Sequence, residues 1–228
     1  MTPPHTLVLP ENGEWRVRVV PNLYPALERQ EVVVHSRRHV RSLGELEDEE
    51  IDLVAEAWRR RRAAEPGGYL HALINEGREA GSSLPHSHSQ LAWLPAPPAP
   101  EPRLEGDLVV ERDGVAAWSP RLARLPYELA LAPVEPEGDS DALDGDRLAP
   151  ALRLLVELVR RLQTLEGPFP FNAWLHDVPP WRIVLLPRLS ILAGLELGAG
   201  VYVNTLPPEE AAERLRNART ASVTAPAE

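Results

Sequence analysis

The stretch from Ser82 to Pro95, SSLPHSHSQLAWLP, places polar side chains on alternate residues and then continues into an apolar segment that ends at proline. In a β-strand, alternate side chains point to the same face. His86, His88 and Gln90 would therefore lie in a row on one surface. The stretch predicts a strand that enters the sheet from a loop and carries a polar, convergent surface at its beginning.

This row has the residue types that phosphoryl chemistry uses. A neutral histidine can attack phosphorus with one ring nitrogen if the other donates to a fixed acceptor such as a backbone carbonyl. Gln90 can donate to a phosphoryl oxygen. Just upstream, NEGREAGSS supplies the charge of Arg78, glycines for close backbone approach, and the hydroxyls of Ser82 and Ser83. The pattern predicts a phosphate site with a nucleophile.

Two other interpretations of His86 and His88 stay open from the residues alone. The histidines can be ordinary surface positions at the end of a strand. A second possibility is a metal site, because two histidines on alternate strand residues form a common pair of ligands. A metal needs further ligands, and the sequence offers none at an informative spacing.

Composition excludes several classes of chemistry. The net charge is −10 over 228 residues, which argues against a nucleic-acid partner, because phosphate neutralisation needs a basic face. The chain has no cysteine, so disulfides and thiolate sites are excluded. All 24 basic residues are arginine, so lysine-based mechanisms are excluded and a phosphate clamp would use Arg, backbone amides, Ser or Asn.

The amino terminus, MTPPHTLVLPENGEW, has no basic region followed by a long apolar core. No apolar run approaches the roughly 20 residues that a membrane-spanning helix needs. We therefore expect a cytoplasmic protein with no membrane partner.

The elements expected in the first half are two strands, a helix and two strands. EWRVRVVPNLYPAL and QEVVVHS are valine-rich runs typical of strands. The segment 42–68 predicts a helix with a cap at Ser42 and one apolar face, and its WRRRR end is expected to complement the helix dipole. GYLHALINEG and HSQLAWLP are strand-like. APPAPEP predicts an extended connector.

The same order recurs about a hundred residues later. DLVVERDGVAAWSP and YELALAPV are expected strands, the segment 145–167 a helix, and FNAWLHDV with WRIVLLP strands again. This recurrence suggests a duplication and favours an α+β fold over a doubly wound sheet. The last segment predicts a strand over LELGAGVYVN, a proline-initiated helix and a polar tail.

Four segments carry a resemblance to a known family: RVVPNLYPAL, SLGELEDEEIDLVAEAWRRR, NEGREAGSSLPHSHSQ and LELGAGVYVNTLPPEEAAERLR. In this order they resemble galactose-1-phosphate uridylyltransferase, a branch of the histidine triad superfamily, and especially its shorter, ADP-glucose phosphorylase-like members. The resemblance implies two tandem histidine-triad-like modules with antiparallel half-barrel sheets and flanking helices. The expected modules are residues 1–97 and 98–218, followed by a flexible tail at 219–228. The resemblance also implies a homodimer.

The resemblance assigns roles to individual positions of this sequence. His88 matches the family's nucleophile, and Gln90 matches the glutamine that binds the transferring phosphoryl group. The other matches are phosphate contacts at Asn75 and Ser83, a nucleoside contact at Asn22 and a sugar-hydroxyl contact at Glu196.

The metal sites of the family match only in part. His39 and His86 match two of the four ligands of a structural zinc. In the second half, His176 is the one match to a second metal cluster, and Arg182 stands where relatives often have histidine. Two imidazoles do not make a closed tetrahedral site, so we expect no tightly bound metal or other cofactor. Arg182 either occupies part of the vacated second site or is exposed to water.

The expected activity is nucleotidyl transfer between a nucleoside-diphosphate sugar and a sugar phosphate or phosphate, by a ping-pong mechanism through a nucleotidyl-histidine. Two alternatives are kept. The first is a hydrolase of dinucleotides or nucleotide sugars on the same site, with water as the acceptor. The second is a nucleotide-binding protein that has lost catalysis, which the incomplete metal ligands would suit.

Overall fold

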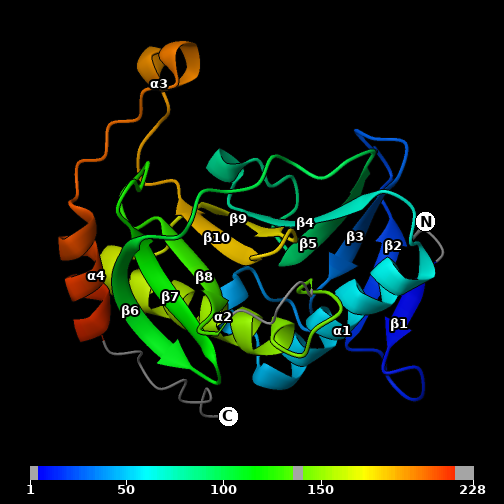
Figure 1. Cartoon of the computed structure of the whole chain (residues 1–228). Helices are drawn as coiled ribbons and strands as arrows, with labels where there is room; N and C mark the ends of the chain where they lie inside the picture. Colours follow the sequence, from blue (N-terminus) through cyan, green and yellow to red (C-terminus); the bar gives the residue numbers. More distant parts are fainter. Residues whose placement is uncertain (1–4, 136–140, 219–228) are drawn as a thin grey trace.

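One ten-stranded antiparallel sheet runs through the whole chain in the computed structural model, which describes residues 5–135 and 141–218 (Figure 1). Its strand order is β1-β2-β3-β5-β4-β9-β10-β8-β7-β6. The strands are β1 Leu7–Leu9, β2 Val17–Pro21, β3 Gln30–Val34, β4 Tyr69–Glu76, β5 His88–Leu94, β6 Gly106–Arg112, β7 Val115–Pro120, β8 Leu129–Pro133, β9 Phe171–His176 and β10 Arg182–Pro187. The helices are α1 Asp48–Ala64, α2 Leu148–Glu166, α3 Gly194–Ala199 and α4 Pro208–Asn217, with short 3-10 turns η1 Leu43–Glu45 and η2 Arg78–Ala80.

The sheet order is the same in both halves when it is counted from the centre. β4 and β9 pair in the middle, followed outward by β5 and β10, β3 and β8, β2 and β7, and β1 and β6. α1 follows β3, and α2 follows β8. The α+β class is thus confirmed, and the order is what a duplication predicts. The sheet continues without a break across the middle, and the boundary between residues 97 and 98 stays a prediction.

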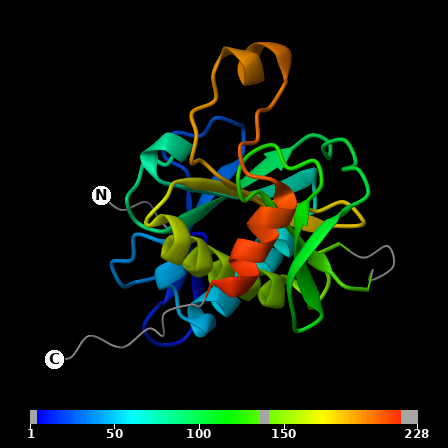
Figure 2. The same cartoon turned by 90° about the vertical axis from the view of Figure 1, so that its left-hand side faces the viewer.

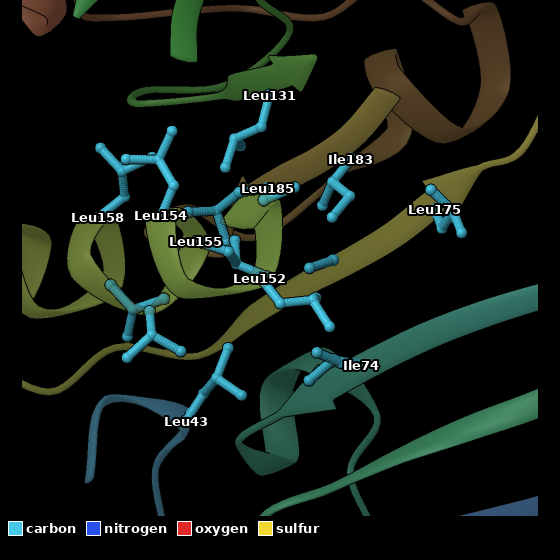
Figure 3. Packing of buried hydrophobic residues seen from close by; sticks show 14 of the residues in the cluster. Leu43, Ile74, Leu131, Leu152, Leu154, Leu155, Leu158, Leu175, Ile183 and Leu185 are labelled. Carbon is cyan, nitrogen blue, oxygen red and sulfur yellow. The ribbon is translucent and has the colours of Figure 1, made fainter. Parts of the chain in front are cut away.

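The long helices α1 and α2 lie side by side against one face of the sheet (Figures 1 and 2). α2 has a broad apolar stripe, which places Leu152, Leu155 and their neighbours between the helix and the strands. Figure 3 shows these leucines meeting Leu175, Ile183 and Leu185 from the central strands. The core therefore lies on the helix side, and the other face of the sheet is free to present polar residues.

The first long helix begins later than the sequence indicated. Ser42 caps η1 instead, because its Oγ accepts from the backbone N of Gly44 at 3.2 Å. α1 starts at Asp48, where the backbone N of Glu47 donates to Glu50 Oε2 at 3.0 Å. The predicted apolar face is confirmed, since its four residues are all buried: Ile51, Val54, Ala55 and Trp58.

Three strand predictions differ from the structure. β1 was not predicted. The segment expected as one strand at 107–120 is a hairpin, because Asp113 and Gly114 adopt positive φ angles of 51° and 75°, as a tight turn between twisted strands requires. The strand expected over 195–204 is absent. Instead α3 forms there and ends at Ala199, with Gly200 as its C-cap.

The carboxy-terminal helix is confirmed, with Pro208 in its first turn. α4 packs against β6 at the edge of the sheet. The tail at 219–228 lies outside the described residues. The segment that carries α3 projects away from the body in both views (Figures 1 and 2). Within the described ranges, no helix is long and apolar enough to cross a membrane.

Candidate active site

His88 is the first residue of β5 and lies on the face of the sheet opposite the helices. Ser89, the next residue, accepts from Trp58 Nε1 of α1 at 2.9 Å, which fixes the strand from behind. His88 Nδ1 lies 2.8 Å from the carbonyl oxygen of His86. Because a carbonyl oxygen can only accept, Nδ1 carries the proton and Nε2 keeps its lone pair. Burial lowers the pKa of His88, so the ring is neutral at pH 7.

Gln90 lies on the same face of β5, one alternation further along the strand. Its Oε1 accepts a hydrogen bond from the side-chain amide of Gln30, which comes from the neighbouring strand β3. The hydrogen bond fixes which end of the Gln90 amide is the donor. Both hydrogens of its Nε2 remain free to donate to a ligand.

A cavity of about 1010 Å³ opens beside His88, between the end of β4 and the beginning of β5. It brings together four residues that the sequence had singled out: Asn75, Arg78, Ser83 and His88. His86 and Ser82 also line it, and Arg41 adds a second guanidinium. The polar loop from Gly77 to Pro85 therefore forms one wall of a cavity that contains the neutral histidine.

The second half of the chain supports this cavity through residues that the sequence did not reveal. Asn172 of β9 pairs with Asn75 across the centre of the sheet, and its Nδ2 donates to Asn75 Oδ1 at 2.8 Å and to the carbonyl oxygen of Ala80 at 2.8 Å. Arg188 Nη1 in turn donates to Asn172 Oδ1 at 3.0 Å. The spacing of residues in the sequence could not predict these roles of Asn172 and Arg188, because the pairing of β4 with β9 brings the two residues to the cavity wall.

Three predicted site residues are not among those that line the cavity: Gln90, which lies further along β5, Asn22 and Glu196. Asn22 follows β2, and its backbone N donates to the carbonyl oxygen of Gln30 at 2.9 Å. Gln30 pairs with Ala92, four residues beyond His88 in β5, which is about 13 Å along the strand direction. Asn22 is therefore well separated from His88. Glu196 is on the projecting segment, where its Oε2 accepts from the backbone N of Ala193 at 2.9 Å. The structure therefore does not bring Glu196 to the cavity of its own chain.

A third histidine lies behind the motif. His35 is fully buried, and its Nδ1 is 3.0 Å from Ser87 Oγ, between His86 and His88. It had no recognisable partner in the sequence. Its pKa is lowered well below the ordinary value, first by burial and then by the nearby His88 and His86. His35 is therefore a neutral packing residue directly under the site.

This burial predicts acid sensitivity of the fold. The unfolded chain binds a proton at His35 near pH 6.5, whereas the folded chain binds it only at a lower pH. Stability is therefore fully present above pH 6.5 and is lost as the pH falls below it. We expect the His35 contribution to the free energy of unfolding to fall by about 1.4 kcal/mol at pH 5.5. Urea unfolding at pH 7.5 and 5.5 measures this change. His35→Gln should lose less over the same interval, and an equal loss would contradict the assignment.

The donors near the motif do not fit a closed zinc site. The His39 and His86 rings have centroids 5.7 Å apart, but His86 Nε2 is engaged with the carbonyl oxygen of Ser36 at 2.9 Å. Among the described residues, no group of three or more His, Asp or Glu side chains is placed to hold a metal.

Arg182 lies at the corresponding place in the second half. It is the first residue of β10, pairs with His176 of β9 and is only 6% exposed. Its Nη2 donates to the carbonyl oxygen of Pro102, in the connector between the halves, at 2.7 Å. The alternative of an arginine exposed to water is therefore wrong.

Comparison with known proteins finds similarity along most of the chain. Residues 25–95 match the model of the galactose-1-phosphate uridyl transferase N-terminal domain. The ADP-glucose phosphorylase of Arabidopsis thaliana is 25% identical over 89% of this chain and 74% of that protein. The galactose-1-phosphate uridylyltransferase of Thermotoga maritima is 26% identical over 82% of this chain and 73% of that protein.

Solved structures show the same fold. A GalT-like protein from Arabidopsis thaliana superposes with a TM-score of 0.85 at 22% identity, covering 96% of this chain and 89% of that chain. An ADP-glucose phosphorylase from the same plant, with bound ADP-glucose, superposes with a TM-score of 0.85 at 22% identity over 98% and 87%. Over most of its length the chain is therefore similar to enzymes of the galactose-1-phosphate uridylyltransferase family, and residues 25–95 match the N-terminal domain of that family.

Proposed function

We propose that the protein is a nucleotidyltransferase that moves a nucleoside monophosphate between a nucleoside-diphosphate sugar and a sugar phosphate or inorganic phosphate. The observation that carries this proposal is the hydrogen bond from His88 Nδ1 to the His86 carbonyl oxygen, at 2.8 Å. It leaves Nε2 as a neutral nucleophile in a cavity lined by Asn75, Arg78 and Ser83.

The reaction proceeds in two displacements. His88 Nε2 attacks the α-phosphorus, the bond from that phosphorus to the bridging oxygen breaks, and the sugar phosphate leaves with the electron pair. An oxygen of the acceptor phosphate then attacks the same phosphorus and releases the histidine. The Nε2 hydrogens of Gln90, which its contact with Gln30 leaves free, donate to the non-bridging oxygens as charge develops. The guanidiniums of Arg41 and Arg78 balance the remaining phosphate charge.

Intact-protein mass spectrometry tests this proposal. The wild-type chain is incubated separately with UDP-glucose, UDP-galactose, ADP-glucose and a diadenosine polyphosphate. A mass gain of one nucleotidyl group is expected with at least one donor, and its size identifies the base. If nucleotide binds but no donor gives an adduct, the proposal fails. Release of free nucleoside monophosphate would then indicate the hydrolase, and no turnover would indicate lost catalysis.

We also propose a homodimer, with the contact made by the projecting segment at 189–203. This segment has an unusual share of exposed apolar side chains for a monomer, among them Ile191 at 92% exposed and Leu197 at 74%. The others are Leu189, Leu195, Val201, Tyr202 and Val203. Docking against a second copy would cover these side chains, and it would give Glu196 a route to the partner's cavity and hence to a sugar.

Sedimentation velocity tests the dimer. The wild type should sediment at about twice the chain mass of 25.3 kDa. Ile191→Arg should sediment as a monomer, because a charge replaces an apolar contact. Leu122→Arg is the matched control, since Leu122 is 87% exposed but lies outside the segment. A monomeric wild type would contradict the proposal.

A further inference from the structure

The two halves of the sheet can be compared position by position. At the centre, Leu73 of β4 pairs with Trp174 of β9. Leu73 also pairs outward with Gln90 of β5, and Trp174 pairs outward with Val184 of β10. Gln90 and Val184 are therefore counterparts about this central pair.

The same comparison relates His88 to Arg182. His88 lies two residues before Gln90, and Arg182 lies two residues before Val184. Each is the first residue of its strand. Both therefore lie on the face of the sheet opposite the helices. Where the first half has its neutral histidine, the second half has a guanidinium.

Arg182 is a buried cation without a carboxylate partner at ion-pair distance in the described part of the chain. Its one described hydrogen bond is to the carbonyl oxygen of Pro102. Its cross-strand neighbour His176 is 3% exposed, and the Nε2 of that ring is buried with no hydrogen-bond partner. Burial of a charge or polar nitrogen without a partner costs free energy, which an anionic ligand would offset.

A cavity of about 530 Å³ adjoins Arg182. Arg103, Arg121 and Arg124 also line it, and Glu128 forms an ion pair with Arg124 at 2.5 Å. Among the described residues, Arg103 and Arg121 have no ion-pair partner. The two other acidic residues in the lining, Glu101 and Glu105, also form no described ion pair. Cations thus exceed acids around the cavity, although the whole chain carries a net charge of −10.

We propose that this cavity is an anion-binding site for a phosphate group, separate from the cavity at His88. The two cavities share no lining residue. A guanidinium keeps its proton and has no free lone pair, so Arg182 binds the anion through its forked N–H donors and forms no covalent adduct. This inference does not depend on the nucleotidyl transfer proposed above.

Isothermal titration calorimetry on the full chain tests the site, with inorganic phosphate and glucose 1-phosphate as separate probes. His88→Ala should still bind anion at the Arg182 cavity. Arg182→Gln should weaken that site at least tenfold and leave nucleotidyl-adduct formation at His88 unchanged. Equal affinity for the two probes would identify the bare phosphate group as the ligand, and tighter binding of glucose 1-phosphate would identify a phosphorylated sugar.

The controls separate loss of the site from loss of the fold. Arg153→Gln removes an arginine that pairs with Asp52 far from this cavity, and it should titrate as the wild type does. The double variant Arg103→Gln/Arg121→Gln changes only exposed residues of the cavity and should also weaken anion binding about tenfold. It tests the proposal even if Arg182→Gln does not fold. Wild-type titration curves for both cavity variants would overturn the proposal.

Discussion

His88→Ala should remove nucleotidyl-adduct formation and reduce turnover by about 10⁴-fold or more, because His88 supplies the Nε2 lone pair that forms the covalent intermediate, whereas the Nε2 of the other histidine in the lining, His86, is engaged with the Ser36 carbonyl oxygen. The fold should remain intact. The truncation removes one hydrogen bond, from Nδ1 to the His86 carbonyl oxygen, and leaves the strand supported from behind by the bond between Trp58 and Ser89. Steady-state rates and the intact mass of the donor-treated variant measure the two effects.

His86→Ala is the matched control for this prediction. Its ring is engaged with the Ser36 carbonyl oxygen, so its loss should alter the order of the loop or the stability and leave adduct formation largely in place. Circular dichroism of both variants shows whether they fold. Full activity of His88→Ala would show that the proposed mechanism is wrong, whatever the behaviour of His86→Ala.

The sequence was sufficient for the features that local pattern determines. The alternation of His88 and Gln90 predicted a strand with both on one face, because that relation depends only on the pleat. His86, predicted on the same strand face, lies before β5 begins, with its ring engaged by the Ser36 carbonyl oxygen. The apolar spacing of Ile51, Val54 and Trp58 likewise predicted the buried face of α1. Neighbouring residues settle such relations, so one sequence suffices.

Contacts made by strand pairing were not predictable from one sequence. Gln30, which orients Gln90, lies sixty residues away, and Asn172, which holds Asn75, lies about a hundred residues away. His35 had no partner in its own segment, and its contact with Ser87 follows from the pairing of β3 and β5. Each of these contacts depends on sheet order, which the spacing of residues does not encode.

The failed strand prediction over 195–204 has a different cause. Its apolar residues have the composition of a strand, but the segment projects from the body (Figure 2). A strand needs a partner for its backbone groups, and none of the described strands lies against this segment. The short helix α3 satisfies those groups locally, and its apolar side chains stay exposed.

The arginine run at 59–62 shows how a correct local prediction can miss an energetic role. It does end α1, as expected, but Arg61 points to the sheet and not to water. Its Nε and Nη2 each donate to Glu31 of β3 at 2.8 Å, and Arg61 and Glu31 are 8% and 6% exposed. Glu31 pairs with Leu91 in β5, the strand that begins at His88. The ion pair therefore ties the helix to the strands of the site.

Glu31→Leu should lower the free energy of unfolding by about 3–5 kcal/mol, because it leaves the buried guanidinium of Arg61 without its hydrogen-bonded carboxylate and with only Glu65 Oε1 at 3.8 Å. For a chain of this length, that loss corresponds to a fall in Tm of roughly 6–20 °C. Urea unfolding and calorimetry measure the two quantities.

The double variant Glu31→Leu/Arg61→Met distinguishes a cost of unpaired charge from a cost of lost packing. Replacing both partners with apolar side chains of similar size removes the uncompensated charge, so it should restore most of the stability that Glu31→Leu loses. Asp52→Ala is the exposed control, because it breaks the ion pair between Asp52 of α1 and Arg153 of α2. The Asp52 and Arg153 side chains are 46% and 33% exposed, so the free energy of unfolding should fall by less than about 1 kcal/mol. If the double variant is as unstable as Glu31→Leu, packing and not charge holds α1 to β3, and the interpretation of the ion pair is wrong.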